Sequence, residues 1–498
     1  MSRLEHLENN QNQPAKPLVS TTVRRYRLLE AFAWLIIAAV IVFKSVLPAL
    51  EQVEFNPQEP SEGINLEAQV MKLQGQWLLA AHNMTPEEDR KTLIDQIKLL
   101  EVGSVGQRQR AAVLLGVLDG SSEARESLRR LDASASEYGI VLSESQTRVD
   151  SILSRIFSKR KSAGQSRSDQ FGSISTDDRV FLRKELGWFG DIAIARTQSG
   201  EEGVWSEYLS SSIGKMVLMV IVFVLGGGLV LLGVVGLSLG IIWSVKGRLR
   251  ALSTGPSGGV FIETFACWLI LLIVLTGVLG HLTDNVSLPL LGTVVGFFLS
   301  LLAIFWLILR RMGWSEAMRQ IGLTSGNGWW REVLAGVAGY AMMLPILAIG
   351  VVGTLFLTML SKALSAARNP FASDSSGAHP IIAMFEDASI FELVLVFVTA
   401  CVAAPIVEEI AFRGILYRGL RNQTSRLSTA LSITLSGLLS GFIFAAIHPQ
   451  GWVAIPALGS IALAMALARE WRESLIAPMT MHAINNSAVL TFVLIMMS

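Results

Sequence analysis

The sequence is poor in charged residues for its length. Only 16% of its 498 residues are charged, whereas a soluble domain carries about 25%. Hydrophobic residues make up 51% of the chain, and its mean hydropathy is +0.49. The composition therefore excludes an ordinary water-soluble enzyme and is typical of a polytopic membrane protein.

Neither sign of charge is in surplus, and cysteine is scarce. The 41 Lys and Arg residues balance 40 Asp and Glu residues, so no basic surface for nucleic acid is expected. The two cysteines, Cys267 and Cys401, both lie inside apolar stretches. They exclude a disulfide framework and a thiolate metal cluster. Nucleic-acid partners and zinc held by sulfur are therefore not expected.

Nine stretches are long and apolar enough to cross a bilayer, which takes about 20 residues of helix. The predicted spans are 30–50, 214–245, 260–280, 286–309, 332–360, 390–415, 428–447, 452–468 and 475–497. We therefore expect an all-α polytopic helix bundle. The first stretch follows Arg27 and is broken by Lys44, so it fits either a signal anchor, which we favour, or a cleaved signal peptide.

Short basic loops predict the orientation of these spans, because Lys and Arg accumulate on the cytoplasmic side. Counting the spans in order places every basic cluster on one side of the membrane. The clusters are Arg24 to Arg27; Lys246, Arg248 and Arg250; Arg310, Arg311 and Arg319; Arg418, Arg421 and Arg426; Arg469 and Arg472. The N-terminus is then cytoplasmic, and a bacterial plasma (inner) membrane is the expected location.

Region 51–213 differs from the rest of the chain. It is rich in Glu, Gln, Arg and Ser, with apolar residues at helical spacing, so we expect an extracytoplasmic helical domain whose role the sequence does not reveal. The predicted division is a cytoplasmic tail with a signal-anchor helix at 1–50, this domain at 51–213, additional transmembrane helices at 214–319, and a C-terminal membrane domain at 320–498.

Two adjacent carboxylates, Glu408 and Glu409, lie in a predicted membrane helix, where ionisable groups are costly and mark candidate functional sites. Adjacent side chains point about 100° apart around a helix, so these two cannot share one role. Glu409 and Arg413 have the i, i+4 spacing of an ion pair. We therefore predict that Glu409 and Arg413 give structural support, while Glu408 is free to point into a cavity.

Two histidines occupy the same apolar C-terminal block. His448 ends one predicted span, one residue before Pro449. His482 and Asn486 are at i and i+4 and therefore share one face of the last span. We predict that Glu408, His448 and His482 converge from three helices on one polar cavity that water can reach.

This set of side chains suffices to hydrolyse an amide bond. Glu408 is the natural general base, and His448 is placed to share its proton or to orient the water. His482 and Asn486 can donate to a carbonyl oxygen as it becomes tetrahedral. No serine or cysteine has a clear base partner, so direct attack by water is favoured over an acyl-enzyme.

Three motifs in about 320–498 resemble the signature of the CPBP intramembrane proteases, the group of the type II CAAX prenyl endopeptidases and bacteriocin-processing enzymes. They are the strings Glu408-Glu409-x-x-x-Arg413, Phe444-x-x-x-His448 and His482-x-x-x-Asn486. The resemblance implies hydrolysis of a peptide or protein substrate within the membrane, with Glu408 and His448 activating water. It implies that His482 and Asn486 form the oxyanion hole. Neither the substrate, its prenylation nor the oligomeric state follows.

Metal dependence stays open at this point. The zinc-protease string His-Glu-x-x-His is absent. Glu408, His448 and His482 remain candidate ligands of a divalent metal such as zinc, with one coordination position open. A metal-free mechanism that requires no cofactor uses the same residues and is preferred.

A non-catalytic membrane protein is the alternative reading: a scaffold, an immunity factor or a transporter. Transporters tend to have broken helices in two similar halves, and the sequence shows no inverted repeat. Retention of the complete set of polar residues favours an enzyme.

Overall fold

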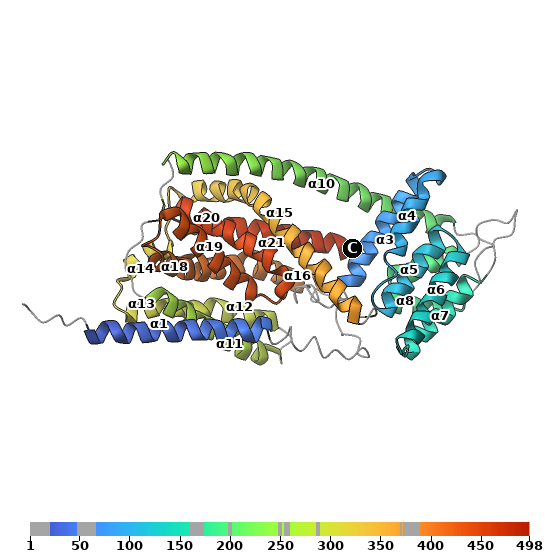
Figure 1. The fold of residues 1–498 in the computed structure, drawn as a ribbon, viewed down its shortest axis with the longest axis horizontal. Helices are drawn as coiled ribbons and strands as arrows, with labels where there is room; N and C mark the ends of the chain where they lie inside the picture. Colours follow the sequence, from blue (N-terminus) through green and yellow to red (C-terminus); the bar gives the residue numbers. More distant parts are fainter. Residues whose placement is uncertain are drawn as a thin grey trace, which may run out of the picture.

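The chain is helical throughout the part that the computed structural model describes. That part comprises residues 20–46, 66–158, 174–197, 202–247, 251–252, 259–284, 289–368, 371 and 389–497. Its regular elements are all helices, with no strand among them. A small domain of short helices lies at one end of a bundle of long helices (Figure 1). The predicted all-α fold class is therefore confirmed.

The short helices form a domain with its own apolar core. They are α3 (Leu66–Met84), η3 (Glu87–Asp89), α4 (Arg90–Lys98), α5 (Val105–Leu118), α6 (Ser121–Glu137), α7 (Glu144–Ile156), α8 (Thr176–Leu186) and α9 (Trp188–Thr197). Ser104 and Ser143 start α5 and α7 through capping boxes, which satisfy amide groups that a helix start leaves unpaired. Helix α5 lies at the centre, since Ala111 to Leu115 are fully buried.

One carboxyl group in this domain should make its stability depend on pH. Gln109 Nε2 donates to Asp150 Oδ1 at 2.9 Å. Burial, assisted by the charge of Asp132, raises the pKa of Asp150 to about 6 against the lowering effect of this hydrogen bond. The folded domain then binds a proton more tightly than the unfolded chain, so its stability is greatest below about pH 4 and falls as the pH rises through about 6.

Asp150→Asn should remove this dependence, because asparagine keeps an acceptor for Gln109 and does not ionise. Hydrogen exchange of the α5 and α7 amides in the full-length protein, corrected for the intrinsic effect of pH, measures it. Wild type should lose protection between about pH 4 and about pH 7, and the variant should not. An equal loss in both proteins would contradict the assignment.

Eight helical segments in the described part of the chain are long and apolar enough to cross a membrane. They are Arg27–Ser45, Val204–Val245, Val260–Thr283, Leu290–Leu309, Trp329–Leu364, Ile390–Gln423, Thr429–Ala446 and Trp452–Arg472. They correspond in order to the first eight predicted spans, although positions 47–50 of the first lie outside the described residues. The predicted polytopic bundle is therefore confirmed.

The elements of the bundle begin with α1 (Ser20–Ile41), which continues as the π-helical turn η1 (Val42–Val46). The others are α10 (Glu202–Val245), α11 (Val260–Asp284), α12 (Pro289–Ser300), η5 (Leu301–Ile304), α13 (Phe305–Leu309), α14 (Trp314–Ile321), α15 (Trp329–Arg368), α16 (Ile390–Val398), η7 (Thr399–Ala403), α17 (Ala404–Glu409), η8 (Ile410–Leu416), α18 (Tyr417–Gln423), α19 (Thr429–Ala446), η9 (Trp452–Ala454), α20 (Ile455–Arg472) and α21 (Ile476–Met497).

The ninth predicted span forms α21 but is not among these eight segments. Its 22 residues would cover about 33 Å, close to the thickness of the hydrocarbon core. It carries the polar side chains of His482, Asn485 and Asn486. These are the residues that carry the candidate chemistry, so α21 is polar where it faces the protein site.

Helix α10 joins the small domain to the bundle without a break. Trp205, Tyr208 and Leu209 at its start pack on the core of the small domain. The helix then passes through position 213, where the sequence predicts a domain boundary, and runs along the edge of the bundle (Figure 1). Because the helix is continuous, the small domain and the membrane helices are linked by a stiff element rather than a linker.

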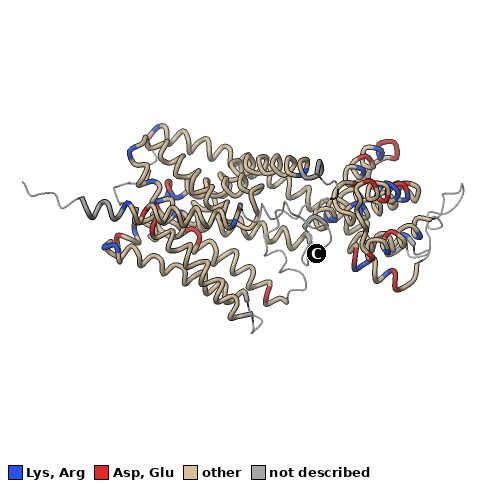
Figure 2. Tube along the Cα trace, turned by 60° about the horizontal axis from the view of Figure 1, so that its bottom comes forward, with Lys and Arg blue, Asp and Glu red and all other residues tan. Residues whose placement is uncertain are grey.

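Charged residues gather in the small domain and at the far end of the bundle (Figure 2). At that far end buried ion pairs connect separate helices. Arg472 on α20 binds Glu332 on α15 through two contacts of 2.8 Å, and Glu470 accepts hydrogen bonds from Tyr417 and Arg421. Arg248 and Arg250 of the predicted basic clusters lie outside the described residues.

Candidate active site

The helix with the two glutamates departs from regular α geometry on both sides of them. The short segment α17 ends at Glu409 and lies between the π-helical turns η7 and η8. In η7 the backbone N–H of Ala404 reaches the Thr399 carbonyl. The next residue, Pro405, has no N–H to donate, so a regular turn cannot be completed here. Such π turns are frequent at functional sites. In the sequence, Pro405 is the residue that indicates an irregular helical turn at this place.

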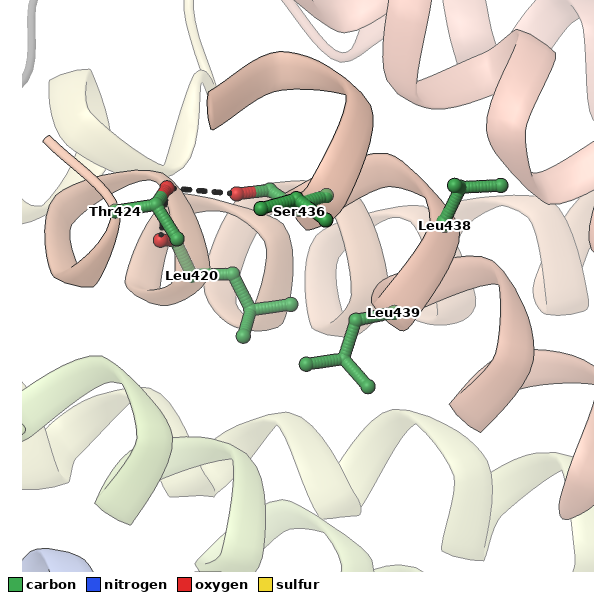
Figure 3. A pocket seen from close by; sticks show the side chains of 6 residues that line it. Leu420, Thr424, Ser436, Leu438 and Leu439 are labelled. Atoms are coloured by element: carbon green, nitrogen blue, oxygen red, sulfur yellow. Dashed lines mark hydrogen bonds between the residues drawn. The ribbon is translucent and has the colours of Figure 1, made fainter. Parts of the chain in front are cut away.

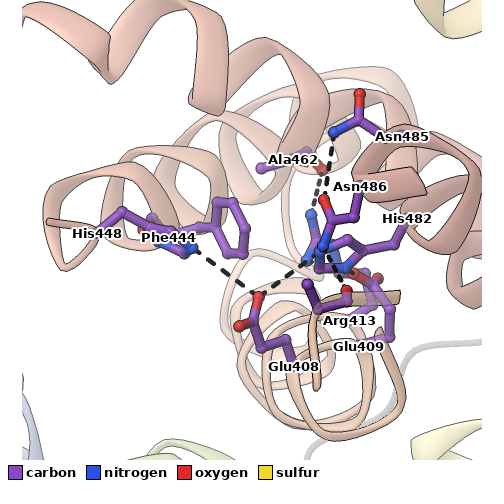
Figure 4. Close-up of polar contacts among 10 residues, drawn as sticks. Glu408, Glu409, Arg413, Phe444, His448, Ala462, His482, Asn485 and Asn486 are labelled. Carbon is purple, nitrogen blue, oxygen red and sulfur yellow. Dashed lines mark hydrogen bonds and ion pairs between the residues drawn. The ribbon is translucent and has the colours of Figure 1, made fainter. Parts of the chain in front are cut away.

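The structure brings Glu408, His448 and His482 together from three helices (Figure 4). Glu408 Oε2 lies 3.9 Å from His448 Nε2 and 3.8 Å from His482 Nε2. This oxygen is buried and has no hydrogen-bond partner among the described residues. Both separations exceed a direct hydrogen bond and are short enough for one water molecule to bridge.

Each histidine is held through its Nδ1 atom. His448 Nδ1 is 2.5 Å from the carbonyl oxygen of Phe444, which can only accept, so Nδ1 carries the proton. His482 Nδ1 is 2.9 Å from Glu409 Oε1 and donates to that carboxylate. Both Nε2 atoms are thereby turned toward Glu408, and each ring has a fixed orientation.

Glu409 contacts two partners, of which the sequence predicted one. Its Oε1 accepts from Arg413 Nη1 at 2.9 Å, which is the predicted i, i+4 pair, and from His482 Nδ1 at the same distance. Arg413 also donates to the Ala462 carbonyl of α20 at 3.3 Å. Glu409 and Arg413 are fully buried. Sequence reasoning missed the contact with His482, because no spacing relates residues on separate helices.

Asn486 lies beside the site, and its amide contacts the backbone of η7. Its Nδ2 donates to the Ala400 carbonyl of η7 at 2.7 Å, whereas His482 Nε2 faces Glu408. That both side chains serve one carbonyl oxygen of a substrate stays a prediction. An amide nitrogen carries two N–H groups, so the Ala400 contact uses one donor and leaves the other for a substrate oxygen.

Phe444 forms the apolar wall between the two imidazoles. Its ring centroid lies 4.1 Å from that of His448 and 6.3 Å from that of His482. The Arg413 guanidinium lies over its face at 4.9 Å, and Phe412 packs against it at the same centroid distance. The sequence singled out Phe444 as part of a motif without giving it a role. In the structure its ring packs against His448, His482 and Arg413 and so sets the distances between these polar side chains.

Helix α11, which lies before the three motifs in the chain, supports the glutamate helix directly. Phe265 and Trp268 pack on Phe412 with ring centroids 5.2 and 5.6 Å apart. These rings belong to the same buried cluster as Phe444. The geometry of the site therefore depends on helices outside the motif region.

One apolar pocket lies apart from these residues, between α18 and α19 (Figure 3). Leucine side chains form most of its wall, and Thr424 and Ser436 bind each other at 3.1 Å beside it. None of the predicted site residues lines it. The cavity predicted at Glu408 is not this pocket.

The described residues do not form a ready metal centre. No three His, Cys, Asp or Glu side chains in that part of the chain are grouped so as to hold a metal ion. Glu408, His448 and His482 face one another, and the contact of His482 Nδ1 with Glu409 leaves its Nε2 turned toward Glu408.

Comparison with known proteins gives one match. Residues 390–488 match the family model described as Type II CAAX prenyl endopeptidase Rce1-like. No curated protein and no solved structure matches the chain. The matched range begins at α16 and ends just past Asn486, so it contains all three motifs and leaves out α1, the small domain and α10 to α15. Residues 390–488 of this multi-pass membrane protein are therefore similar to an Rce1-like domain, in agreement with the CPBP resemblance of its motifs.

Proposed function

We propose that the protein is an intramembrane endopeptidase that hydrolyses peptide bonds of membrane-associated peptide or protein substrates. One observation carries the proposal: Glu408 Oε2 is buried with no hydrogen-bond partner among the described residues, and it lies 3.9 and 3.8 Å from two imidazole nitrogens whose rings are fixed by other contacts. A base, a place for water and oriented proton carriers are the parts that hydrolysis by water requires. The Rce1-like match supports the same activity class.

In the first step Glu408 removes a proton from a water molecule held between it and His448. The resulting hydroxide oxygen bonds to the scissile carbonyl carbon, and the carbonyl electrons move to its oxygen. When the tetrahedral intermediate collapses, the C–N bond breaks and the proton passes from the Glu408–His448 pair to the leaving nitrogen. Water is consumed and no covalent enzyme intermediate forms.

The oxyanion is stabilised by His482 and Asn486. His482 donates its Nδ1–H to Glu409, so its Nε2 can donate to substrate only when the ring carries both protons. In that doubly protonated form the Glu409 carboxylate is the hydrogen-bond and charge partner of the ring. Glu409 thus acts through His482. It corresponds to the buried acid of a catalytic triad, which holds the histidine ring in its orientation and pairs with its charge.

We also propose an orientation. Basic residues cluster at the end of the bundle away from the small domain (Figure 2), which supports a cytoplasmic N-terminus and a small domain on the outer side of a plasma (inner) membrane. The C-terminal ends of α15 and α21 face that outer side, so residues 51–213 are proposed to be extracytoplasmic.

The function is tested by comparing membrane peptidomes from cells that carry either the intact protein or Glu408→Ala. Peptides that appear only with the intact protein identify cleavage sites, including any in lipidated substrates. Identical peptidomes at equal protein levels would favour the scaffold, immunity or transport class.

Metal-free chemistry is tested on purified protein. Turnover should survive a chelator, and His482→Ala should lose turnover at unchanged metal content. Chelator inhibition matched by stoichiometric metal loss in His482→Ala would assign His482 to a metal ion instead.

Asn486→Ala should lower kcat by about 100- to 1000-fold with KM nearly unchanged, because the amide stabilises charge that develops only during reaction. Steady-state kinetics and the Tm of the purified variant measure this. Ser487→Ala is the matched control, since the Ser487 hydroxyl binds the Ala483 carbonyl within its own helix. A raised KM at unchanged kcat would mean that Asn486 binds substrate rather than the transition state.

A further inference from the structure

The C-terminal end of α19 leaves one backbone carbonyl without a partner from its own chain segment. The Ile447 N–H reaches the Ile443 carbonyl, and the His448 N–H reaches the Ala445 carbonyl. The Ala446 carbonyl would next require an N–H from Pro449 or Gln450. Proline has none, and the Gln450 N–H makes no backbone hydrogen bond to Ala446.

The donor to this carbonyl comes from the first helix. The Ser45 hydroxyl in η1 donates to the Ala446 carbonyl oxygen. Ala446 is the last residue of α19 and stands two positions before His448. The hydroxyl therefore caps the helix end that carries the imidazole facing Glu408.

Further contacts keep α1 in this place. Gln423 at the end of α18 donates to Glu30 in the middle of α1. Between the two ends, Ala33 and Ile37 are buried in the same apolar cluster as Ile443 and Phe444. The stretch from Glu30 to Ser45 thus contacts the Rce1-like domain at both of its ends, although it lies outside the matched range.

We propose that Ser45 is a positioning residue of the active site, which holds the end of α19 so that His448 keeps its place beside Glu408. The inference rests on the proposed hydrolytic function. It makes α1 part of the working enzyme rather than only an anchor, and loss of α1 as a signal peptide would remove this donor.

The hydroxyl is tested by the pair Ser45→Thr and Ser45→Val, which have nearly the same volume and branching and differ in one hydroxyl group. Ser45→Thr should keep the kcat of the wild type. Ser45→Val and Ser45→Ala should lower kcat by about tenfold, the effect of one lost hydrogen bond, at unchanged KM. Ser212→Ala is the control, because Ser212 also donates to a backbone carbonyl but lies in α10.

Equal kcat for the threonine and valine variants would overturn the inference. So would a fall in Tm that accounts for the lost activity of Ser45→Val, since that would assign a purely structural role. Glu408→Gln in the same assay distinguishes a failure of the hydrolytic function from a failure of the positioning role of Ser45. If it retains turnover the hydrolytic proposal fails, and if only the Ser45 variants retain turnover the positioning role alone fails.

Discussion

Glu408→Gln should lower turnover of a membrane peptide by about 100- to 10,000-fold, the usual contribution of general acid–base catalysis, while leaving Tm close to that of the wild type. Glutamine keeps the shape of the side chain and removes the base. Glu408 Oε2 has no hydrogen-bond partner among the described residues, so the substitution breaks no contact that supports the fold. Single-turnover kinetics in vesicles and thermal unfolding measure the two quantities.

Glu392→Gln is the matched control for this substitution. Glu392 lies on the same helical segment, but it is exposed and caps the start of α16 together with Ser389. Glutamine serves equally well in a capping box, so both turnover and Tm should stay near wild type. Full turnover in Glu408→Gln would remove Glu408 from the chemistry and favour a non-catalytic membrane protein.

Glu409→Gln should reduce both stability and turnover. The sequence predicts only the first effect, because Arg413 loses its charge partner in a buried place, a loss that costs about 3–5 kcal/mol. The contact with His482 adds the second effect. Without the carboxylate, the ring that donates to the oxyanion loses its charge partner and the contact that orients it, so kcat should fall by about 100-fold at nearly unchanged KM.

Arg413→Gln separates these two effects. It breaks the same ion pair but leaves the Glu409 carboxylate on His482 Nδ1. A similar fall in Tm is expected, with a smaller fall in kcat for the protein that remains folded. If kcat per folded molecule is reduced equally in both variants, the proposed action of Glu409 through His482 is wrong.

The sequence determined features that depend on composition and on spacing within one helix. Scarcity of charge and nine apolar stretches predicted the polytopic α bundle, and the i, i+4 spacing predicted the Glu409–Arg413 pair. Helical geometry sets these neighbours, since residues one turn apart are adjacent whatever the rest of the fold does. The three motifs also named the residues that the structure brings together.

The tertiary structure decided how those residues face one another. The Glu409–His482 contact, the turn of Asn486 toward Ala400, and the capping of Ala446 by Ser45 all join separate helices. Each depends on the rotation and depth of one helix relative to another, which packing of side chains such as Phe444 determines and which no period in a single segment encodes. The roles proposed for the second glutamate and for the first helix therefore rest on packing between helices.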